Sequence, residues 1–352
     1  MKIQRWIAVV CILALAFTAC GKEEKSEVAS GNNAIEQAKQ NKGYKETEIE
    51  LPQEAGANTI LNTFMAEDGT PAFFAADTSG GENQDVTDLS FKYKKLTLNS
   101  ENGWDSTDVE WSDALNDVVN AFPAGGIIIG EDGNEYMVMG QYTGDTSAED
   151  INEQEVKLSL YCIKGEEVEK VKCDGLSRKE DGETLFVNAI YIGQDETAVF
   201  MYNNGKCVLY DLVTGEEKLE YSQRFTSYVS VYQDCLFGAN EAKDGIDVVD
   251  KMTGELLSTI PAEIGSGNAV VGTNVNNDLF YVVEKGIYRI SDDMKSSELV
   301  VDGKVFSEFG MSTETSFGNV WEKDGTFYVF YNRGKTAGSM LDYMKLYSYQ
   351  QN

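Results

Sequence analysis

The chain has 352 residues, and its 29 Lys and Arg stand against 59 Asp and Glu, which gives a net charge of −30 at pH 7. Such an acidic surface repels nucleic acid phosphates, so we expect no nucleic acid partner. The sequence contains no His, which excludes Ser-His-Asp and Cys-His catalysis and His-ligated metal sites. Its length is enough for one large all-β domain or two smaller ones.

Residues 1–19 have the pattern of an export signal. A short basic start precedes the apolar run from Trp6 to Ala16, which at about 11 residues is too short for a membrane helix of roughly 20. The junction Phe-Thr-Ala-Cys-Gly at 17–21 resembles the lipobox of bacterial lipoproteins, with Phe where Leu is usual. The resemblance implies that cleavage leaves Cys20 as the lipid-bearing first residue, at the extracytoplasmic face of the cell membrane.

Residues 20–43 have almost no large apolar side chain, which predicts a flexible tether between the lipid and a folded domain at 44–352. Cys11 lies in the predicted signal and would be removed with it on cleavage. None of the remaining cysteines forms a Cys-x-x-Cys pair, so the sequence indicates no zinc or redox motif. We expect four buried thiols that act as small apolar side chains. They are Cys162, Cys173, Cys207 and Cys235.

From Tyr44 onward, short β runs alternate with Gly, Asn and Asp turns, and the chain has only four Pro. This pattern predicts an all-β protein.

Six turns have similar flanking residues. They are centred on Asp68, Asp132, Asp195, Asp234, Asp278 and Asp324. An apolar residue stands three positions before each Asp, and we expect it to end an inner strand in the core: Met65, Ile129, Ile192, Val231, Val275 and Trp321. An aromatic residue follows each turn: Phe73, Tyr136, Phe200, Phe237, Phe280 and Phe327.

A second repeat has the form Asp-x-x-Thr-Gly-Glu. It occurs at 211–216 and again 39 residues later at 250–255, with a degenerate third copy at 286–299. Asp can bond the turn backbone and Gly can adopt a positive φ, which suits a hairpin. The motif resembles the repeats of quinoprotein-like β-propellers. That resemblance implies four-stranded blades around an axis, and six turns fit six blades, or seven if an insertion contains one more.

Two insertions and one missing strand complete the predicted fold. Thr107 and Glu110 resemble a capping box before an apolar stripe, which predicts a short helical insertion over 107–122. A polar, acidic insertion covers 142–155. The last blade has two strands after Asp324 and lacks its outer one, and we expect Tyr44–Leu51 to supply it and close the ring.

The predicted ring has tight turns on one face and long connections on the other. The segments 77–90, 107–122, 142–155 and 335–343 all fall on the second face, in neighbouring blades. Because loops on rigid scaffolds carry function and tight turns cannot enclose a ligand, we expect a partner to bind there. The residues expected nearest to it are Trp104, Asp145, Asp150 and Tyr343.

The sequence favours binding over catalysis. No adjacent Cys pair is present, so quinone chemistry is not expected, nor is any other cofactor. The acidic loop does not match an EF-hand pattern, so no metal is expected. The overall organisation resembles propeller regions of clostridial-type surface lipoproteins. We expect a lipid-anchored, non-catalytic binding protein with a protein or glycan partner. The alternatives are an envelope glycan-degrading enzyme that uses two carboxylates, a scaffold for surface proteins, and an accessory ligand-binding component of a solute uptake system.

Overall fold

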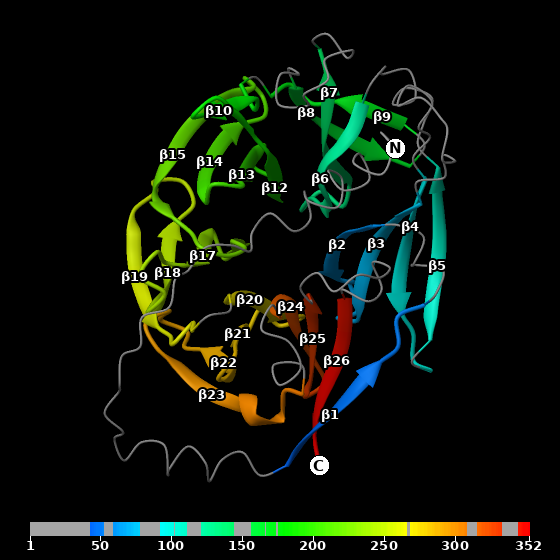
Figure 1. The fold of residues 1–352 in the computed structure, drawn as a ribbon, viewed down its shortest axis with the longest axis vertical. Coiled ribbons are helices and arrows are strands. Elements are labelled where there is room, and N and C mark those ends of the chain that lie inside the picture. The colour runs from blue at the N-terminus through cyan, green and yellow to red at the C-terminus, as the bar shows by residue number, and fades with distance from the viewer. Residues whose placement is uncertain are drawn as a thin grey trace.

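The structure is a computed structural model, and it describes residues 43–52, 59–77, 92–101, 103–110, 121–143, 156–165, 167–173, 175–265, 268–307, 315–332 and 344–352. These ranges are almost entirely β. They hold 26 strands and one short 3-10 helix, η4 (Gly303–Val305). Figure 1 shows the sheets arranged around a central axis. The predicted signal, Cys20 and the tether lie outside the described residues.

Four sheets are separate, antiparallel and four-stranded, with their strands in chain order. The first contains β2 (Thr59–Met65), β3 (Pro71–Asp77), β4 (Lys92–Leu98) and β5 (Trp104–Glu110). The second contains β6 (Ala121–Ile129), β7 (Glu135–Tyr142), β8 (Val156–Lys164) and β9 (Glu167–Lys170). The third contains β12 (Val187–Ile192), β13 (Thr197–Tyr202), β14 (Lys206–Asp211) and β15 (Glu216–Arg224). The fourth contains β16 (Ser230–Tyr232), β17 (Cys235–Ala239), β18 (Gly245–Asp250) and β19 (Leu256–Pro261).

A fifth sheet has eight strands in the order β1-β26-β25-β24-β20-β21-β22-β23. Its members are β1 (Tyr44–Ile49), β20 (Val270–Asn274), β21 (Leu279–Val283), β22 (Gly286–Ile290), β23 (Ser297–Asp302), β24 (Ser316–Lys323), β25 (Thr326–Asn332) and β26 (Met344–Gln351). Two antiparallel runs of four strands meet in a parallel ladder of two residue pairs, Thr273↔Trp321 and Asn274↔Glu322. A small hairpin, β10 (Arg178–Glu180) with β11 (Glu183–Leu185), completes the described strands.

Burial along the strands follows from the packing of the sheets against one another. Every residue of β13, β17, β20 and β21 is buried, because both faces of these strands contact neighbouring sheets. The last strands of the same sheets, β15 and β19, are mainly exposed, with single buried residues such as Tyr221 and Ile260. All six aromatic residues predicted to follow the turns are buried, which confirms that prediction.

The innermost strands contact one another in a closed circuit that runs through β2, β6, β12, β16, β20 and β24 and returns to β2. Asparagine side chains join several of these strands. The Asn62 amide donates to the Ile127 carbonyl at 2.9 Å, and the Asn319 amide donates to the Thr63 carbonyl at 3.3 Å. Asn188 accepts from the Gly126 N–H at 3.1 Å. These inner-strand asparagines carry no motif that the sequence analysis recognised.

The ends of the chain meet as predicted. β1 pairs with β26 in six antiparallel residue pairs, from Tyr44↔Gln351 to Ile49↔Leu346, and Figure 1 shows the two strands together. The Tyr349 hydroxyl donates to Glu46 Oε1 at 2.8 Å, and Lys345 Nζ lies 2.6 Å from Glu48 Oε1. The prediction that the N-terminal strand completes the last run of strands is therefore confirmed.

The Asp-x-x-Thr-Gly-Glu hairpins also form as predicted. Asp211 Oδ1 accepts from the Val213 and Thr214 N–H groups, and Asp250 Oδ1 accepts in the same way from the Met252 and Thr253 N–H groups. The glycine of each copy has a positive φ, 78° at Gly215 and 73° at Gly254. The degenerate third copy forms the hairpin β22–β23.

The predicted helical insertion is wrong where the structure describes it. Thr107 and Glu110 lie in β5 rather than in a capping box, and β6 already begins at Ala121. β5 pairs along its whole length with β4, and Lys94 contributes an ion pair to Asp108 at 3.3 Å. Cross-strand pairing thus overrides the local helix signal. Residues 111–120, which hold most of the apolar stripe, lie outside the described residues.

Two of the apolar residues expected to end inner strands in the core are exposed instead. Trp321 and Ile192 are buried, but Ile129 is 38 % exposed and Val275 is 53 % exposed. Val275 follows the end of β20, and Ile129 is the last residue of β6. Both therefore stand at the rim of the sheets, where no further strand covers them.

A buried lysine joins the third and fourth sheets. Lys251 has a side chain that is 2 % exposed, and its Nζ lies 3.2 Å from Asp195 Oδ2 and 3.1 Å from Asp234 Oδ1. The same ammonium donates to the Tyr191 hydroxyl at 3.1 Å and lies over that ring. Burial lowers the pKa of Lys251, but the hydrogen bonds to Tyr191 and both carboxylates outweigh it, so the pKa lies above its usual value. The described polar contacts of the Lys251 ammonium are all with these residues of the two sheets, so we assign this side chain a structural role.

Candidate functional site

The strand ends show where the long connections begin and end. Successive strands in each sheet are antiparallel, so the β3–β4, β7–β8 and β25–β26 connections all leave from one face. These are the long segments 78–91, 143–155 and 333–343. The opposite face, here called the turn face, carries short turns such as 66–70 and 130–134. The prediction that these three long connections share one face is therefore confirmed.

Of the four residues predicted to lie near a partner, the structure describes only Trp104. Trp104 begins β5 opposite Leu98, so it stands on the turn face. Its indole N–H donates to the Glu50 carbonyl at 3.0 Å and its ring packs edge-on against Phe73 at 4.9 Å. The placement of Trp104 on the long-connection face is therefore wrong, because the turn before it is a third-to-fourth one. Asp145, Asp150 and Tyr343 lie outside the described residues.

A cavity opens where the second sheet ends. β8 has nine residues, whereas β9 has four and pairs only with the last part of β8, from Tyr161 to Lys164. Beyond Lys170 the chain departs from the sheet and leaves a cavity of about 640 Å³. Its lining consists of Thr143, Val156, Lys157, Leu158, Ser159, Lys170, Val171, Lys172, Cys173, Gly175, Leu176, Ser177 and Lys179.

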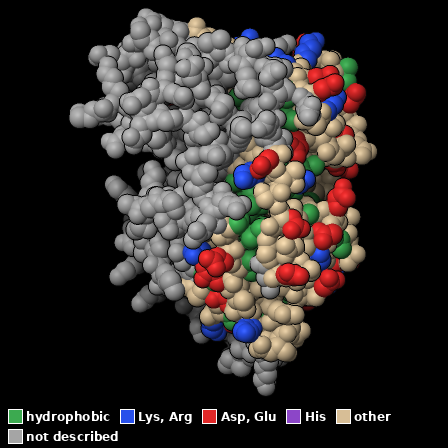
Figure 2. Space-filling view, turned by 90° about the vertical axis from the view of Figure 1, so that its right-hand side faces the viewer, with side chains coloured by type: hydrophobic (Ala, Val, Ile, Leu, Met, Phe, Trp, Pro, Cys, Tyr) green, Lys and Arg blue, Asp and Glu red, His purple; other side chains and the backbone are tan. Residues whose placement is uncertain are grey.

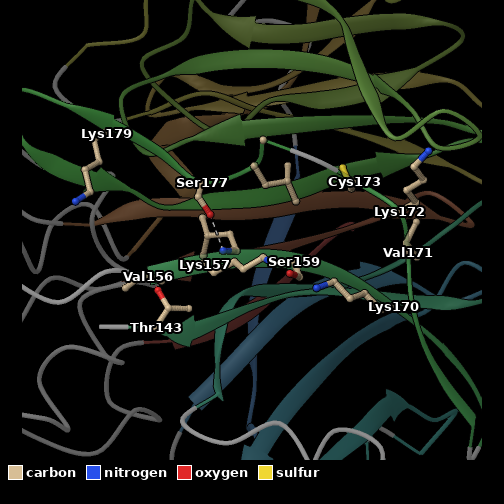
Figure 3. A pocket seen from close by; sticks show the side chains of 13 residues that line it. Thr143, Val156, Lys157, Ser159, Lys170, Val171, Lys172, Cys173, Ser177 and Lys179 are labelled. Atoms are coloured by element: carbon tan, nitrogen blue, oxygen red, sulfur yellow. Dashed lines mark hydrogen bonds between the residues drawn. The ribbon is translucent and has the colours of Figure 1, made fainter. Parts of the chain in front are cut away.

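Hydrogen bonds hold the two walls of this cavity in place. The Leu158 N–H donates to Ser177 Oγ at 2.7 Å, marked by the dashed line in Figure 3, and the Val171 N–H donates to the Leu160 carbonyl at 2.9 Å. Leu176 is buried at 1 %, and its carbonyl accepts from the Tyr202 hydroxyl at 3.0 Å. The cavity is thus formed by fixed backbone on both sides, as in most small-molecule sites.

Among the described residues, four lysines and no acidic residue line this cavity: Lys157, Lys170, Lys172 and Lys179. Within the described ranges none of the four takes part in an ion pair. Other lysines of the chain do so, for example Lys218 with Asp211 at 2.8 Å. Figure 3 shows Lys179 and Lys172 at the two ends of the lining, with Lys170 between them. In a chain of net charge −30, this set, which we call the lysine cavity, is a local concentration of positive charge.

The lysine cavity also holds a hydroxyl and a thiol. Ser159 is 7 % exposed, and its hydroxyl has no hydrogen-bond partner among the described residues. Cys173 is partly exposed, whereas Cys162, Cys207 and Cys235 are buried as predicted. None of the four is in a disulfide within the described part of the chain. Burial raises the pKa of the Cys162 and Cys207 thiols, so these are poor nucleophiles.

The side of the molecule near β5 has a different character. Figure 2 shows acidic side chains spread over its described surface, with fewer basic ones between them. The hydrophobic side chains lie recessed among them. The described charged residues in the lining of the lysine cavity are all lysines, and this distinguishes the cavity from that surface.

The lysine cavity was not predicted from the sequence, although a signal was present. Six of the 29 basic residues lie between 157 and 179, in a chain where acids outnumber bases about twofold. The predicted site touches the cavity at one point. The acidic segment that contains Asp145 and Asp150 is bounded by Thr143 and Val156, and both of these residues line the cavity.

Two negative observations apply to the described residues. In them, no three His, Cys, Asp or Glu side chains are grouped as ligands of a metal ion would be. The same ranges contain no helix with the length and apolar character needed to cross a membrane.

The fold and the cavity define an all-β, propeller-like protein with a basic ligand-sized cavity. Beyond this class the comparisons assign no family, since no family model and no curated protein matches the chain.

Solved structures give a partial likeness. BamB from Moraxella catarrhalis is 12 % identical, with a TM-score of 0.35 over 83 % of each chain. Glutaminyl cyclase from Myxococcus xanthus is 11 % identical, with a TM-score of 0.32 over 66 % of this chain and 91 % of the other. The computationally designed Ika4 protein is 12 % identical, with a TM-score of 0.28 over 43 % and 84 %. At these TM-scores the likeness carries no argument about function.

Proposed function

We propose that the chain is a lipid-anchored, extracytoplasmic binding protein that acts without catalysis and binds its partner on the long-connection face. The observation that carries this proposal is the lysine cavity. It is lined by Thr143 and Val156, which bound one of the long connections, and its walls are fixed by internal hydrogen bonds. A preformed cavity with unneutralised cations suits ligand binding.

We further propose that the ring has six blades. The eight-stranded sheet counts as two of them, because only two residue pairs join β20 to β24, whereas each half is a full antiparallel run of four strands. Six innermost strands then succeed one another around the circuit that returns to β2. This count agrees with the six repeated turns in the sequence.

The anchor rests on the signal-like residues 1–19 and on Cys20. Changing Cys20→Ser should abolish incorporation of labelled fatty acid, because the thiol is the acceptor of the lipid, and should leave a larger precursor. Labelling followed by gel analysis measures both effects. Unchanged labelling in the Cys20→Ser variant would show that no lipid is attached at this position.

Site-specific photo-crosslinking in native membranes tests the binding face. A photoreactive residue is placed at Glu183, which is exposed in the hairpin that follows the lysine cavity. The matched control is Val213, which is 62 % exposed on the turn face. We expect any partner adduct to form at position 183 and none at position 213, because the partner lies on the cavity side. Adducts from position 213 without one from position 183 contradict the proposal.

A further inference from the structure

We propose that the lysine cavity binds a compact polyanion that carries two or more carboxylate or phosphate groups. This inference rests on the proposed function, since it takes the lysine cavity as the binding site and names the chemistry of its ligand. It is carried by three features of the described residues: unneutralised charge, an unpartnered hydroxyl, and a cavity of limited size.

The four lysines of the cavity form no ion pair within the described part of the chain. Two acids on neighbouring strands are engaged elsewhere, since Glu169 pairs with Lys164 at 3.3 Å and Glu220 pairs with Arg178 at 2.8 Å. Glu217 also pairs with Arg178. The four lysines that line the cavity therefore gain no counter-charge from these neighbours. An anion bound among them would relieve their mutual repulsion and gain charge-assisted hydrogen bonds.

The lysines are distributed over two walls, which indicates more than one anionic group in the ligand. Lys157 comes from β8, whereas Lys170, Lys172 and Lys179 come from the end of β9 and the segment after it. The apolar part of the lining consists of Val156, Leu158, Val171 and Leu176. A ligand that combines anionic groups with a less polar part matches this lining, and the Ser159 hydroxyl can donate to one of its oxygens.

The size and edges of the cavity exclude larger occupants. A volume of about 640 Å³ falls in the range of small-molecule sites, which is roughly 300–1,000 Å³. An extended peptide cannot add as a strand along this part of β8, because Ser177 already occupies the Leu158 N–H. The net charge of −30 opposes a nucleic acid. A small polyanion remains as the occupant that the geometry admits.

Calorimetric titration of the full mature protein in detergent tests the inference, with citrate and tripolyphosphate as probes at about 0.15 M salt, where long-range attraction is screened. The test variant is Lys157→Gln/Lys170→Gln. The matched control, Lys243→Gln/Lys295→Gln, removes the same charge at two exposed lysines outside the cavity lining. We expect the Kd to rise about tenfold or more in the test variant, and less than about twofold in the control.

Ser159 and Cys173 supply independent readouts. Ser159→Ala should weaken binding of the probe about threefold while leaving the melting temperature unchanged, because the hydroxyl has no described partner to lose. Bound probe should also slow alkylation of Cys173, measured by mass spectrometry, since this thiol lines the cavity. Protection that is absent from the Lys157→Gln/Lys170→Gln variant ties the effect to the same site.

The two probes separate the ligand classes. Binding of citrate alone assigns a carboxylate ligand, binding of tripolyphosphate alone assigns a phosphate ligand, and binding of both supports the shared chemistry. The inference is overturned if neither probe binds with a Kd below about 1 mM, or if both double variants bind equally well. A crosslinked partner at position 183 without polyanion binding would leave the proposed function standing and remove this inference alone.

Discussion

Removal of residues 43–52 is expected to lower the melting temperature of the mature protein by about 10 °C. The deletion exposes the edge of β26 and removes two buried side chains, Ile49 and Leu51, at 6 % and 8 % exposure. Burial of each stabilises the fold by about 1.5–3 kcal/mol, and the backbone pairing adds to this. A protein of this size loses roughly 2 °C per kcal/mol. Thermal unfolding followed by circular dichroism measures the difference between chains that begin at 43 and at 53.

Lys45→Gln is the matched control for the deletion. Lys45 lies in the same strand opposite Gln350, but it is exposed and forms no ion pair among the described residues. We expect its melting temperature to stay within about 1 °C of the parent protein, as for most surface substitutions. If the deletion variant has the same melting temperature as this control, β1 contributes nothing to the stability of the closed ring.

Gly272→Ala is expected to reduce the free energy of unfolding by about 3 kcal/mol or more. Gly272 lies in β20, where a Cβ atom would stand 1.7 Å from the Val320 carbonyl oxygen of β24. The parallel ladder between these strands begins one residue later, at Thr273. The added methyl group therefore forces apart two strands of the inner circuit. Urea denaturation gives the change in stability directly.

Gly318→Ala provides the comparison for this substitution. Gly318 lies in β24, and its nearest neighbours would be 3.4 Å from a new Cβ, which is ordinary contact. We expect a change below about 1 kcal/mol, because the alanine meets no clash. Equal stability of the two variants would contradict the close approach of β20 and β24.

The parts of the fold that were predictable from sequence are those that a short repeated motif encodes. The Asp211 and Asp250 hairpins combine a side-chain acceptor with a glycine of positive φ, and both requirements are visible in the sequence. The pairing of β1 with β26 followed from counting strands in the last repeat. The predicted helix is wrong at its described ends, residues 107–110 and 121–122, which lie in strands. β5 is stabilised by its partner β4, and a single segment does not show its cross-strand neighbours.

The lysine cavity was not predictable in the same way. Lys157 and Lys170 stand on different strands, and they share a cavity because β9 stops after four residues. The local excess of basic residues was visible in the sequence. Whether these residues are neutralised depends on which of them form ion pairs with carboxylates, and the sequence does not show this. Trp104 shows the reverse case. It was expected near the partner on the long-connection face, whereas its ring packs on Phe73 at the opposite end of the sheet.

The pairing of β1 with β26 also sets an order of events in folding. Contacts such as Lys345 with Glu48 join residues 297 positions apart, so the last sheet is incomplete until nearly the whole chain is available. If the chain is exported as proposed, the N-terminal strand crosses the membrane before its partner β26. Contacts this remote in sequence form slowly, because closing a long loop costs entropy before the contacts stabilise the fold. Until then β1 has no strand partner, and the proposed anchor at Cys20 would keep that unpaired strand close to the membrane from which the rest of the chain is still emerging.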